Sequence, residues 1–225
     1  MDPESPRRLA AFDFDGTLTR RDTLVPFLVF ACGRRAVTMA VSNVAPGVVR
    51  ARLARTDTIA HPRDRAKEAL LAQLMCGREA AWLEDAGRCY AELLPYRLRP
   101  EMMRQLQWHQ DRGHEVVIVS ASLLAYLEPF APEHGVDHVI AVGLEEDADG
   151  VLTGNLTGPN VRGPEKENRL RACATRAALT PPSHHSGSST SLSQTSHPAW
   201  PGRWNLGLST SPARPRQATR AAFAF

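Results

Sequence analysis

Two aspartates separated by a single residue stand at the end of a short apolar run near the beginning of the chain. The run is Leu9–Phe12, and Asp13 and Asp15 are followed directly by Gly16 and Thr17. A short apolar run of this kind predicts a buried β-strand, and the glycine permits a sharp turn after it. Two carboxylates at the tip of a buried strand are costly to desolvate unless a cation lies between them. The pattern therefore favours a cation-binding site over the plain alternative, an Asp-Gly turn that ends a strand.

Side-chain alternation along an extended strand would place both aspartates on one side of the backbone. Phe12 and Phe14 would then point to the other side. Thr17 and Thr19 would add hydroxyl groups beside the amides that the turn frees. We therefore expect acids and hydrogen-bond donors to lie together at the tip of this strand.

A second group of polar residues follows the next strongly apolar stretch. Glu115–Val119 predicts a strand, and Ser120-Ala121-Ser122 connects it to a predicted helix over Leu123–Phe130. Serine hydroxyls and the unpaired amides at the beginning of a helix suit a phosphate group. The simpler alternative is that one serine only caps the helix.

Lysine is rare in this chain, because only Lys67 and Lys166 occur among its 27 lysine and arginine residues. Lys166 lies in the first turn of a helix that we expect to begin at Pro164, a residue type favoured at that position. A predicted β-hairpin, whose second strand contains Val151–Leu156, precedes this helix. A lysine on a charged helix is usually solvated, but the scarcity of lysine and the position after the hairpin favour a functional role.

The string from Asp13 to Thr19 resembles the first signature of the haloacid dehalogenase (HAD) superfamily of hydrolases. The similarity is greatest to subfamily IB, the branch that contains phosphoserine phosphatase, and it extends over residues 7–171. The resemblance implies an α/β fold, a three-layer Rossmann-like core of parallel sheet flanked by helices, with an inserted helical cap. It also implies a Mg²⁺-dependent phosphatase that hydrolyses a small, phosphoserine-like phosphomonoester through an aspartyl-phosphate intermediate.

The same resemblance implies roles for individual residues. Asp13 would be the nucleophile and Asp15 the general acid and base, and both would bind the metal ion. Asp15 would need a raised pKa to act as an acid near neutral pH, because an ordinary aspartate titrates near about 3.9. Asp22 would contact the substrate. The phosphate-binding residues would be Gly16, Thr17, Ser120 and Lys166.

A long insertion separates the first two predicted strands of the core. They lie about 100 residues apart, whereas a strand–helix–strand crossover needs only about 30. Apolar periodicity and turn residues predict that the excess is helical. The expected helices are Asp22–Ala31, Arg34–Val44, Arg63–Met75 and Glu79–Leu94. We therefore assign residues 21–96 to a cap, and residues 1–20 and 97–172 to the core.

The family-like pattern stops near Ala172. Seven of the fourteen residues in Ser183–Ser196 are serine, and the composition predicts a disordered, low-complexity tail over residues 173–225. The resembled fold would have further strands here, with a loop whose aspartate completes the metal site, but no Asp or Glu follows Glu167. A basic tail that binds an acidic partner and a shift of the reading frame both explain the break, and its abruptness favours the frameshift.

The missing carboxylate leaves two functional alternatives open. One is a HAD-type phosphatase, and the other is a catalytically weak or inactive remnant that binds phosphate or a partner. Losing a ligand that positions the metal ion can cost several kcal/mol of transition-state stabilisation, or about a thousandfold in rate.

Charge and cysteine content narrow the classes of partner and location. The net charge of +3 divides unevenly, because residues 168–225 carry seven arginines and no acid. A nucleic-acid-binding domain is usually basic throughout, so we expect a small-molecule substrate and no nucleic acid. The four cysteines lack metal-ligand spacing, which predicts free thiols. Without a signal peptide or a bilayer-length apolar run, we expect a cytoplasmic protein with no transmembrane segment; the sequence does not specify its oligomeric state.

Overall fold

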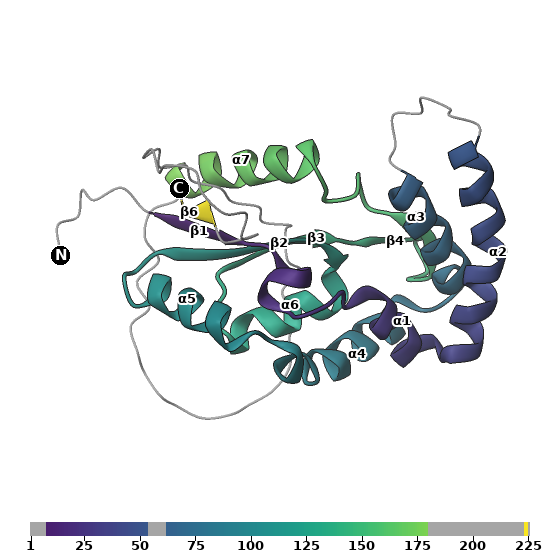
Figure 1. The fold of residues 1–225 in the computed structure, drawn as a ribbon, viewed down its shortest axis with the longest axis horizontal. Coiled ribbons are helices and arrows are strands. Elements are labelled where there is room, and N and C mark those ends of the chain that lie inside the picture. The colour runs from purple at the N-terminus through teal and green to yellow at the C-terminus, as the bar shows by residue number, and fades with distance from the viewer. Residues whose placement is uncertain (1–7, 54–61, 180–222, 225) are drawn as a thin grey trace.

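A parallel β-sheet forms the centre of the computed structural model, which describes residues 8–53, 62–179 and 223–224 (Figure 1). Strands β1 (Leu9–Phe12), β2 (Glu115–Leu123) and β3 (His138–Val142) are parallel, and β6 (Phe223–Ala224) pairs antiparallel with β1. The strand order is β3-β2-β1-β6. Because β1 and β2 are parallel neighbours, the carboxyl ends of both strands meet at one edge of the sheet.

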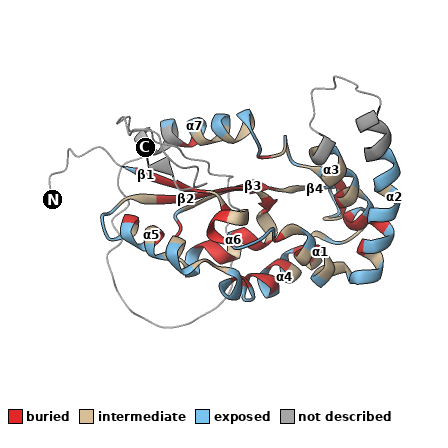
Figure 2. Cartoon of the chain, in the orientation of Figure 1, coloured by how far each residue is buried: buried red, intermediate tan, exposed pale blue. Residues whose placement is uncertain are grey.

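Helices cover both faces of this sheet and complete three layers. Helix α7 (Pro164–Leu179) lies on one face, and α5 (Pro100–Gln110) and α6 (Leu124–Glu133) lie on the other (Figure 1). The expected three-layer α/β core is therefore confirmed. Buried residues concentrate on the strands and on α6 (Figure 2).

The segment between β1 and β2 is helical, as the sequence predicts. It contains α1 (Leu24–Cys32), α2 (Arg34–Leu53), α3 (Pro62–Met75) and α4 (Ala80–Ala91), followed by a short 3₁₀ turn, Leu94–Arg97. The expected end of α2 at Val44 is wrong, because the helix continues past Pro46 and Gly47. Pro46 removes the amide that would bond the carbonyl of Ser42, and Ser42 is exposed, so water can replace that bond.

Two close backbone contacts fix how the inserted helices pack. At Gly87 of α4, an added Cβ would lie 2.0 Å from the carbonyl oxygen of Ala125 in α6, so these helices are in intimate contact. At Gly154, an added Cβ would lie 3.0 Å from Cα of Ala72 in α3. Helix α3 therefore packs against the hairpin of β4 (Leu144–Glu146) and β5 (Leu152–Leu156). We call helices α1–α3 together with this hairpin the α1–α3 layer. The expected division of the chain into a cap over residues 21–96 and a core stays a prediction.

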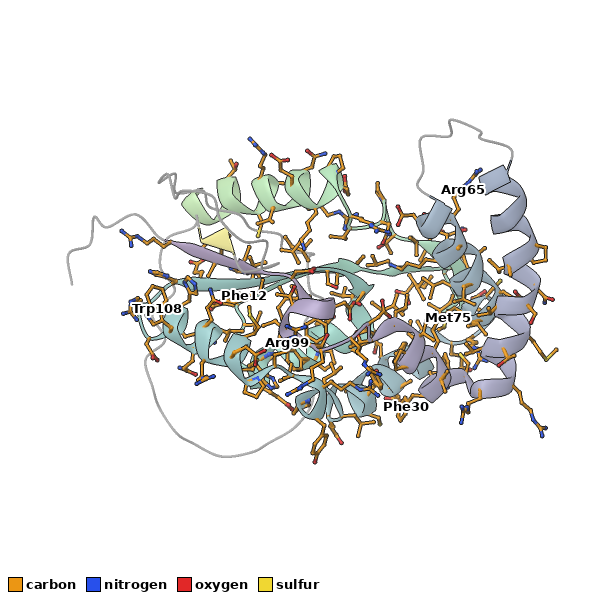
Figure 3. All side chains as sticks on the ribbon, viewed as in Figure 1. Phe12, Phe30, Arg65, Met75, Arg99 and Trp108 are labelled. Carbon is orange, nitrogen blue, oxygen red and sulfur yellow. The ribbon has the colours of Figure 1, made fainter. Side chains whose placement is uncertain are left out.

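Aromatic side chains fill the core between the end of β1 and helices α5 and α6. Phe12 lies between the sheet and α5, with its ring centroid 5.7 Å from that of the buried His109 (Figure 3). Phe14 packs edge-on against Phe130 of α6, at 5.3 Å. Aromatic pairs of this kind add to the free energy gained by burial alone.

Two expectations concern the ends of the described part. Helix α7 continues to Leu179, so residues 173–179, which the sequence assigned to the tail, are helical. Residues 180–222, with the serine-rich stretch and the frameshift question, lie outside the described residues. Among the helices of the described part, none combines the length and apolarity needed to cross a bilayer.

Candidate active site

The chain turns sharply after β1, and this turn carries both aspartates of the predicted signature. Pairing to β2 ends at Phe12, and Phe14–Leu18 forms a tight, kinked turn in which Asp15 and Gly16 are not helical. Gly16 has φ = 74°, a left-handed conformation that favours glycine. The turn is closed by the Thr19 amide, which donates to the carbonyl of Phe14 at 3.0 Å. The strict strand alternation that we expected therefore stops at the strand end.

Asp13 is the more open of the two aspartates. Its Oδ1 accepts a hydrogen bond from Nζ of Lys166 at 2.8 Å, and its Oδ2 accepts one from the hydroxyl of Thr17 at 3.3 Å. The side chains of Asp13 and Lys166 are 42% and 31% exposed. The first and last predicted site residues are thus an ion pair across 153 positions of sequence, and the carboxylate is accessible to a ligand.

Asp15 is held in a different environment, among hydroxyl groups. Its Oδ1 accepts hydrogen bonds from the amide and the hydroxyl of Thr23, at 2.8 and 2.7 Å, and its Oδ2 accepts one from the hydroxyl of Ser122. Burial raises the pKa of Asp15 above its ordinary value, although the bonds from Ser122 and Thr23 act in the opposite direction. A raised pKa is what a carboxyl group needs to donate a proton near neutral pH.

Asp15 depends on residues that the sequence analysis did not assign to the site. The Thr23 hydroxyl is 3.0 Å from the hydroxyl of the buried Tyr126, and Tyr90 donates to the Thr23 carbonyl at 3.2 Å. Ser122 was visible in the Ser-x-Ser pattern, whereas nothing in the sequence marked Thr23 or the two tyrosines. These residues come from α4, α6 and the loop before α1, which only the fold brings together.

Ser120 and Ser122 lie at the irregular end of β2. The register with β3 shifts between Val119 and Leu123, so the intervening residues leave the regular ladder. The Ser122 amide donates to Oγ of Ser120 at 3.0 Å, which leaves the Ser120 hydroxyl hydrogen for another acceptor. This end of β2 therefore lies beside Asp15, and both serines are buried.

Lys67 enters the same region from α3, which the sequence analysis did not foresee. Its ammonium donates to the carbonyl oxygen of Ala121, between the two serines, and to Oδ1 of Asn160 at 2.8 Å. Burial lowers the pKa of Lys67 from 10.5 to about 8, partly offset by the negative charges of Asp64 and Asp15. The one available signal was the rarity of lysine in an arginine-rich chain.

Asp22, the predicted substrate contact, lies at the beginning of α1. Its Oδ1 accepts hydrogen bonds from the amides of Leu24 at 3.0 Å and Val25 at 3.4 Å, which satisfies otherwise unpaired amides of the first turn. Its charge also helps to raise the pKa of Asp15, and it opposes the lowering of the Lys67 pKa by burial. Asp22 is therefore close enough to the cleft to act on its electrostatics.

The donors at the strand tip fit a magnesium ion in part. The described residues contain no cluster of three His, Cys, Asp or Glu side chains arranged to hold a metal ion. Magnesium, however, is usually held by only one or two carboxylates and takes its other ligands from water and substrate phosphate. Asp13, with its partly exposed carboxylate, and the backbone carbonyl of Asp15 are hard oxygen donors of this kind.

Comparisons with known proteins place this geometry in a family. The family model of haloacid dehalogenase-like hydrolases matches residues 10–184. Protein CicA of Caulobacter vibrioides is 35% identical over 164 residues, which cover 72% of this chain and 71% of CicA.

Solved structures share the fold. A protein with unknown function from Bordetella pertussis Tohama I has a TM-score of 0.56 at 24% identity and covers 76% of each chain. A probable phosphoserine phosphatase from Vibrio cholerae has a TM-score of 0.52 at 20% identity, over 75% of this chain and 46% of that one. The fold likeness, the matched family model and the relative agree with the signature at Asp13 and Asp15. This chain belongs to the haloacid dehalogenase-like hydrolase family.

Proposed function

We propose that this protein is a phosphatase that hydrolyses small phosphomonoesters through a phosphorylated Asp13, with Mg²⁺ as its cofactor. The observation that carries the proposal is the contrast between two neighbouring acids. Asp13 is accessible and paired with Lys166, whereas Asp15 is largely shielded from solvent and has a raised pKa. A nucleophile and a proton donor need environments that differ in this way.

In the first step, an Oδ atom of Asp13 attacks the phosphorus atom of the ester. The new bond joins phosphorus to the Asp13 oxygen, and the bond from phosphorus to the ester oxygen breaks. Asp15 gives its proton to the departing alkoxide, so the alcohol leaves neutral. Lys166, already 2.8 Å from Asp13, keeps the nucleophile oriented and offers its charge to the phosphoryl oxygens.

In the second step, water hydrolyses the phosphorylated Asp13. Asp15, now a carboxylate, takes a proton from the attacking water, and the bond between phosphorus and the Asp13 oxygen breaks. Inorganic phosphate leaves, and Asp15 is again protonated. Thr23 and Ser122 hold the Asp15 carboxylate in one orientation through both steps, which limits the reorganisation needed.

The remaining predicted residues would bind the phosphoryl group and the metal ion. Gly16, Thr17 and Ser120 would supply amide and hydroxyl donors, and Lys67 would add a positive charge from α3. The Asp13 carboxylate and the Asp15 carbonyl would hold Mg²⁺, which when bound neutralises charge between the two anions. The support for these roles is that the side chains converge at the ends of β1 and β2.

The proposed substrate is a small phosphorylated metabolite, with phosphoserine-like compounds as the first group to try. Asp22 near the cleft would suit a substrate that carries an amino group. The expected cytoplasmic location accords with such a substrate and stays a prediction.

A second candidate function is a weak or inactive protein that binds phosphate without turnover. It is favoured by one observation: no Asp or Glu follows Glu167, so the third carboxylate expected of the metal site is absent from the sequence.

Magnesium-dependent hydrolysis of p-nitrophenyl phosphate separates the two candidates. We expect turnover that requires Mg²⁺, is abolished by EDTA, and falls at least about a thousandfold in Asp13→Asn, because that change removes the nucleophile. Asp149→Asn, in an exposed turn, is the matched control. Turnover retained in Asp13→Asn would exclude Asp13 as the nucleophile, and phosphate binding without any turnover would support the second candidate.

A further inference from the structure

A group of polar contacts joins α3 to the loop that leads into α7. Asn160 lies at its centre, between two residues of α3. Its Oδ1 accepts a hydrogen bond from Nζ of Lys67 at 2.8 Å, and its Nδ2 donates to Oδ1 of Asp64 at 2.6 Å. The same Asp64 oxygen lies 3.6 Å from Nη1 of Arg162.

The positions of these residues in the fold show which segments the contacts join. Asp64 and Lys67 are three residues apart on α3, so their side chains lie on the same face of the helix. Asn160 follows β5 and precedes Lys166 by six residues. A single amide therefore touches Lys67 directly and anchors the segment that leads to Lys166.

Asparagine suits this place because one planar group carries both an acceptor and a donor. The acceptor meets the ammonium of Lys67 and the donor meets the carboxylate of Asp64, so both partners are charged. Hydrogen bonds to charged groups are stronger than neutral ones. The Asp64 side chain is only 17% exposed, which limits competition from water.

Lys67 needs such a partner to be held in place. Its long side chain has many rotamers, and ordering it costs conformational entropy. The bonds to Ala121 and Asn160 use two of its three ammonium hydrogens, which leaves the third for a phosphoryl oxygen. Without Asn160, the Ala121 carbonyl would be the one hydrogen-bond acceptor left to the ammonium among the residues that the structure describes.

We infer that Asn160 is a positioning residue. It holds the Lys67 ammonium beside Ser120 and Ser122 at the end of β2. Through its bond to Asp64, it also ties the loop before Lys166 to α3. One side chain thus sets the places of both lysines around the phosphoryl group. The inference rests on the proposed function in one respect, that the two lysines bind a phosphate-like anion.

Sulfate, a phosphate mimic, tests the inference without requiring turnover. Binding to the full chain is measured by calorimetry at pH 7.0 and constant ionic strength. We expect Asn160→Ala to weaken sulfate binding about tenfold, since a hydrogen bond to a charged group is lost. Asn155→Ala is the matched control. The Asn155 side chain donates a hydrogen bond to Glu145 within the hairpin and none of its described hydrogen bonds reaches Lys67.

A second background distinguishes positioning from a merely structural effect. In Lys67→Met, the ammonium that Asn160 orients is gone, and only the tie from Asp64 to the loop before Lys166 remains. Adding Asn160→Ala should therefore weaken sulfate binding by clearly less than the tenfold expected with Lys67 present. An equal loss in both backgrounds would overturn the inference, as would unchanged affinity in Asn160→Ala alone. If Asn160→Ala unfolds, Asn160→Leu fills the same volume without either hydrogen bond and carries the same expectation.

Failure of the proposed function would look different. If Lys67→Met and Lys166→Met both bind sulfate like the unchanged protein, the anion site itself is wrong. If Lys67→Met weakens sulfate binding while Asn160→Ala does not, the anion site is supported and the positioning role of Asn160 is excluded.

Discussion

At the scale of single residues, two aspartates two positions apart acquire opposite properties from their neighbours. Asp13 faces Lys166 and stays accessible, whereas Asp15 is enclosed by Thr23 and Ser122. Burial disfavours the ionised form of Asp15, so its pKa rises. The sequence predicted that both acids would matter, but the difference between them arises from partners on other elements.

The raised pKa of Asp15 predicts that its ionised carboxylate lowers the stability of the folded protein at neutral pH. A raised folded-state pKa means that the folded protein binds this proton more tightly than the unfolded chain. The stabilising contribution is therefore complete below the unfolded pKa of 3.8 and is lost as the pH rises through the folded value. Asp15→Asn, which is always neutral, should gain stability over the unchanged protein as the pH rises.

Thermal unfolding at pH 5 and pH 8 checks this expectation. We expect Asp15→Asn to melt roughly 2–4 °C higher than the unchanged protein at pH 8, which corresponds to about 1 kcal/mol, with a smaller difference at pH 5. Asp149→Asn, at an exposed position, should show no such trend. A loss of stability in Asp15→Asn that grows with pH would contradict the raised pKa.

At the scale of elements, the contact between α4 and α6 supports the end of β2 that carries Ser120 and Ser122. Helix α6 begins at Leu124, directly after the turn that contains Ser120 and Ser122, so its position sets theirs. Gly87 of α4 lets the two helices approach closely, because a Cβ there would meet the Ala125 carbonyl. The sequence shows a glycine inside an amphipathic helix, and only the packing explains it.

Substituting two helical glycines separates packing from helix propensity. Gly87→Ala should destabilise the protein by about 1–3 kcal/mol, since the added methyl group forces α4 away from α6. Gly47→Ala in α2, where nothing lies within 4 Å, should instead stabilise by about 0.4–1 kcal/mol. Denaturant unfolding measures both. Equal effects at the two positions would show that the α4–α6 contact is looser than described.

At the scale of the whole molecule, the α1–α3 layer meets the core at the active-site edge of the sheet (Figure 1). This meeting buries Lys67 in part and lowers its pKa to about 8. The low pKa is therefore a property of the assembled layers and not of α3 alone. Arg65, two positions earlier on α3, points away from the core (Figure 3) and is exposed.

The lowered pKa of Lys67 predicts an alkaline limit to anion binding. The ammonium charge is present below about pH 8 and is lost above it. Sulfate affinity should therefore fall about tenfold between pH 7 and pH 9, if the charge of Lys67 is needed. Lys67→Arg should show a flat profile over this range, because arginine stays charged. Calorimetry at several pH values measures the two curves, and curves of the same shape would rule out Lys67 as the titrating group.

Much of the architecture could be predicted because local patterns carry it. The apolar runs at Leu9–Phe12 and Glu115–Val119 lie in strands, and the helices between β1 and β2 lie close to their expected positions. The extension of α2 past Pro46 could not be predicted, because a proline is tolerated only where the freed carbonyl can reach water.

What the sequence by itself determined is which groups near the strand ends could do chemistry: two acids, a serine pair and a rare lysine. What the tertiary structure alone decided is how those groups differ and which others join them. The pKa of Asp15 rose, and Lys67 and Asn160 came close to it, through burial and hydrogen bonds between segments far apart in the chain. The reason is physical. Residue type sets whether a group can bind and release a proton, but the surrounding dielectric, nearby charges and hydrogen bonds set how tightly that proton is held.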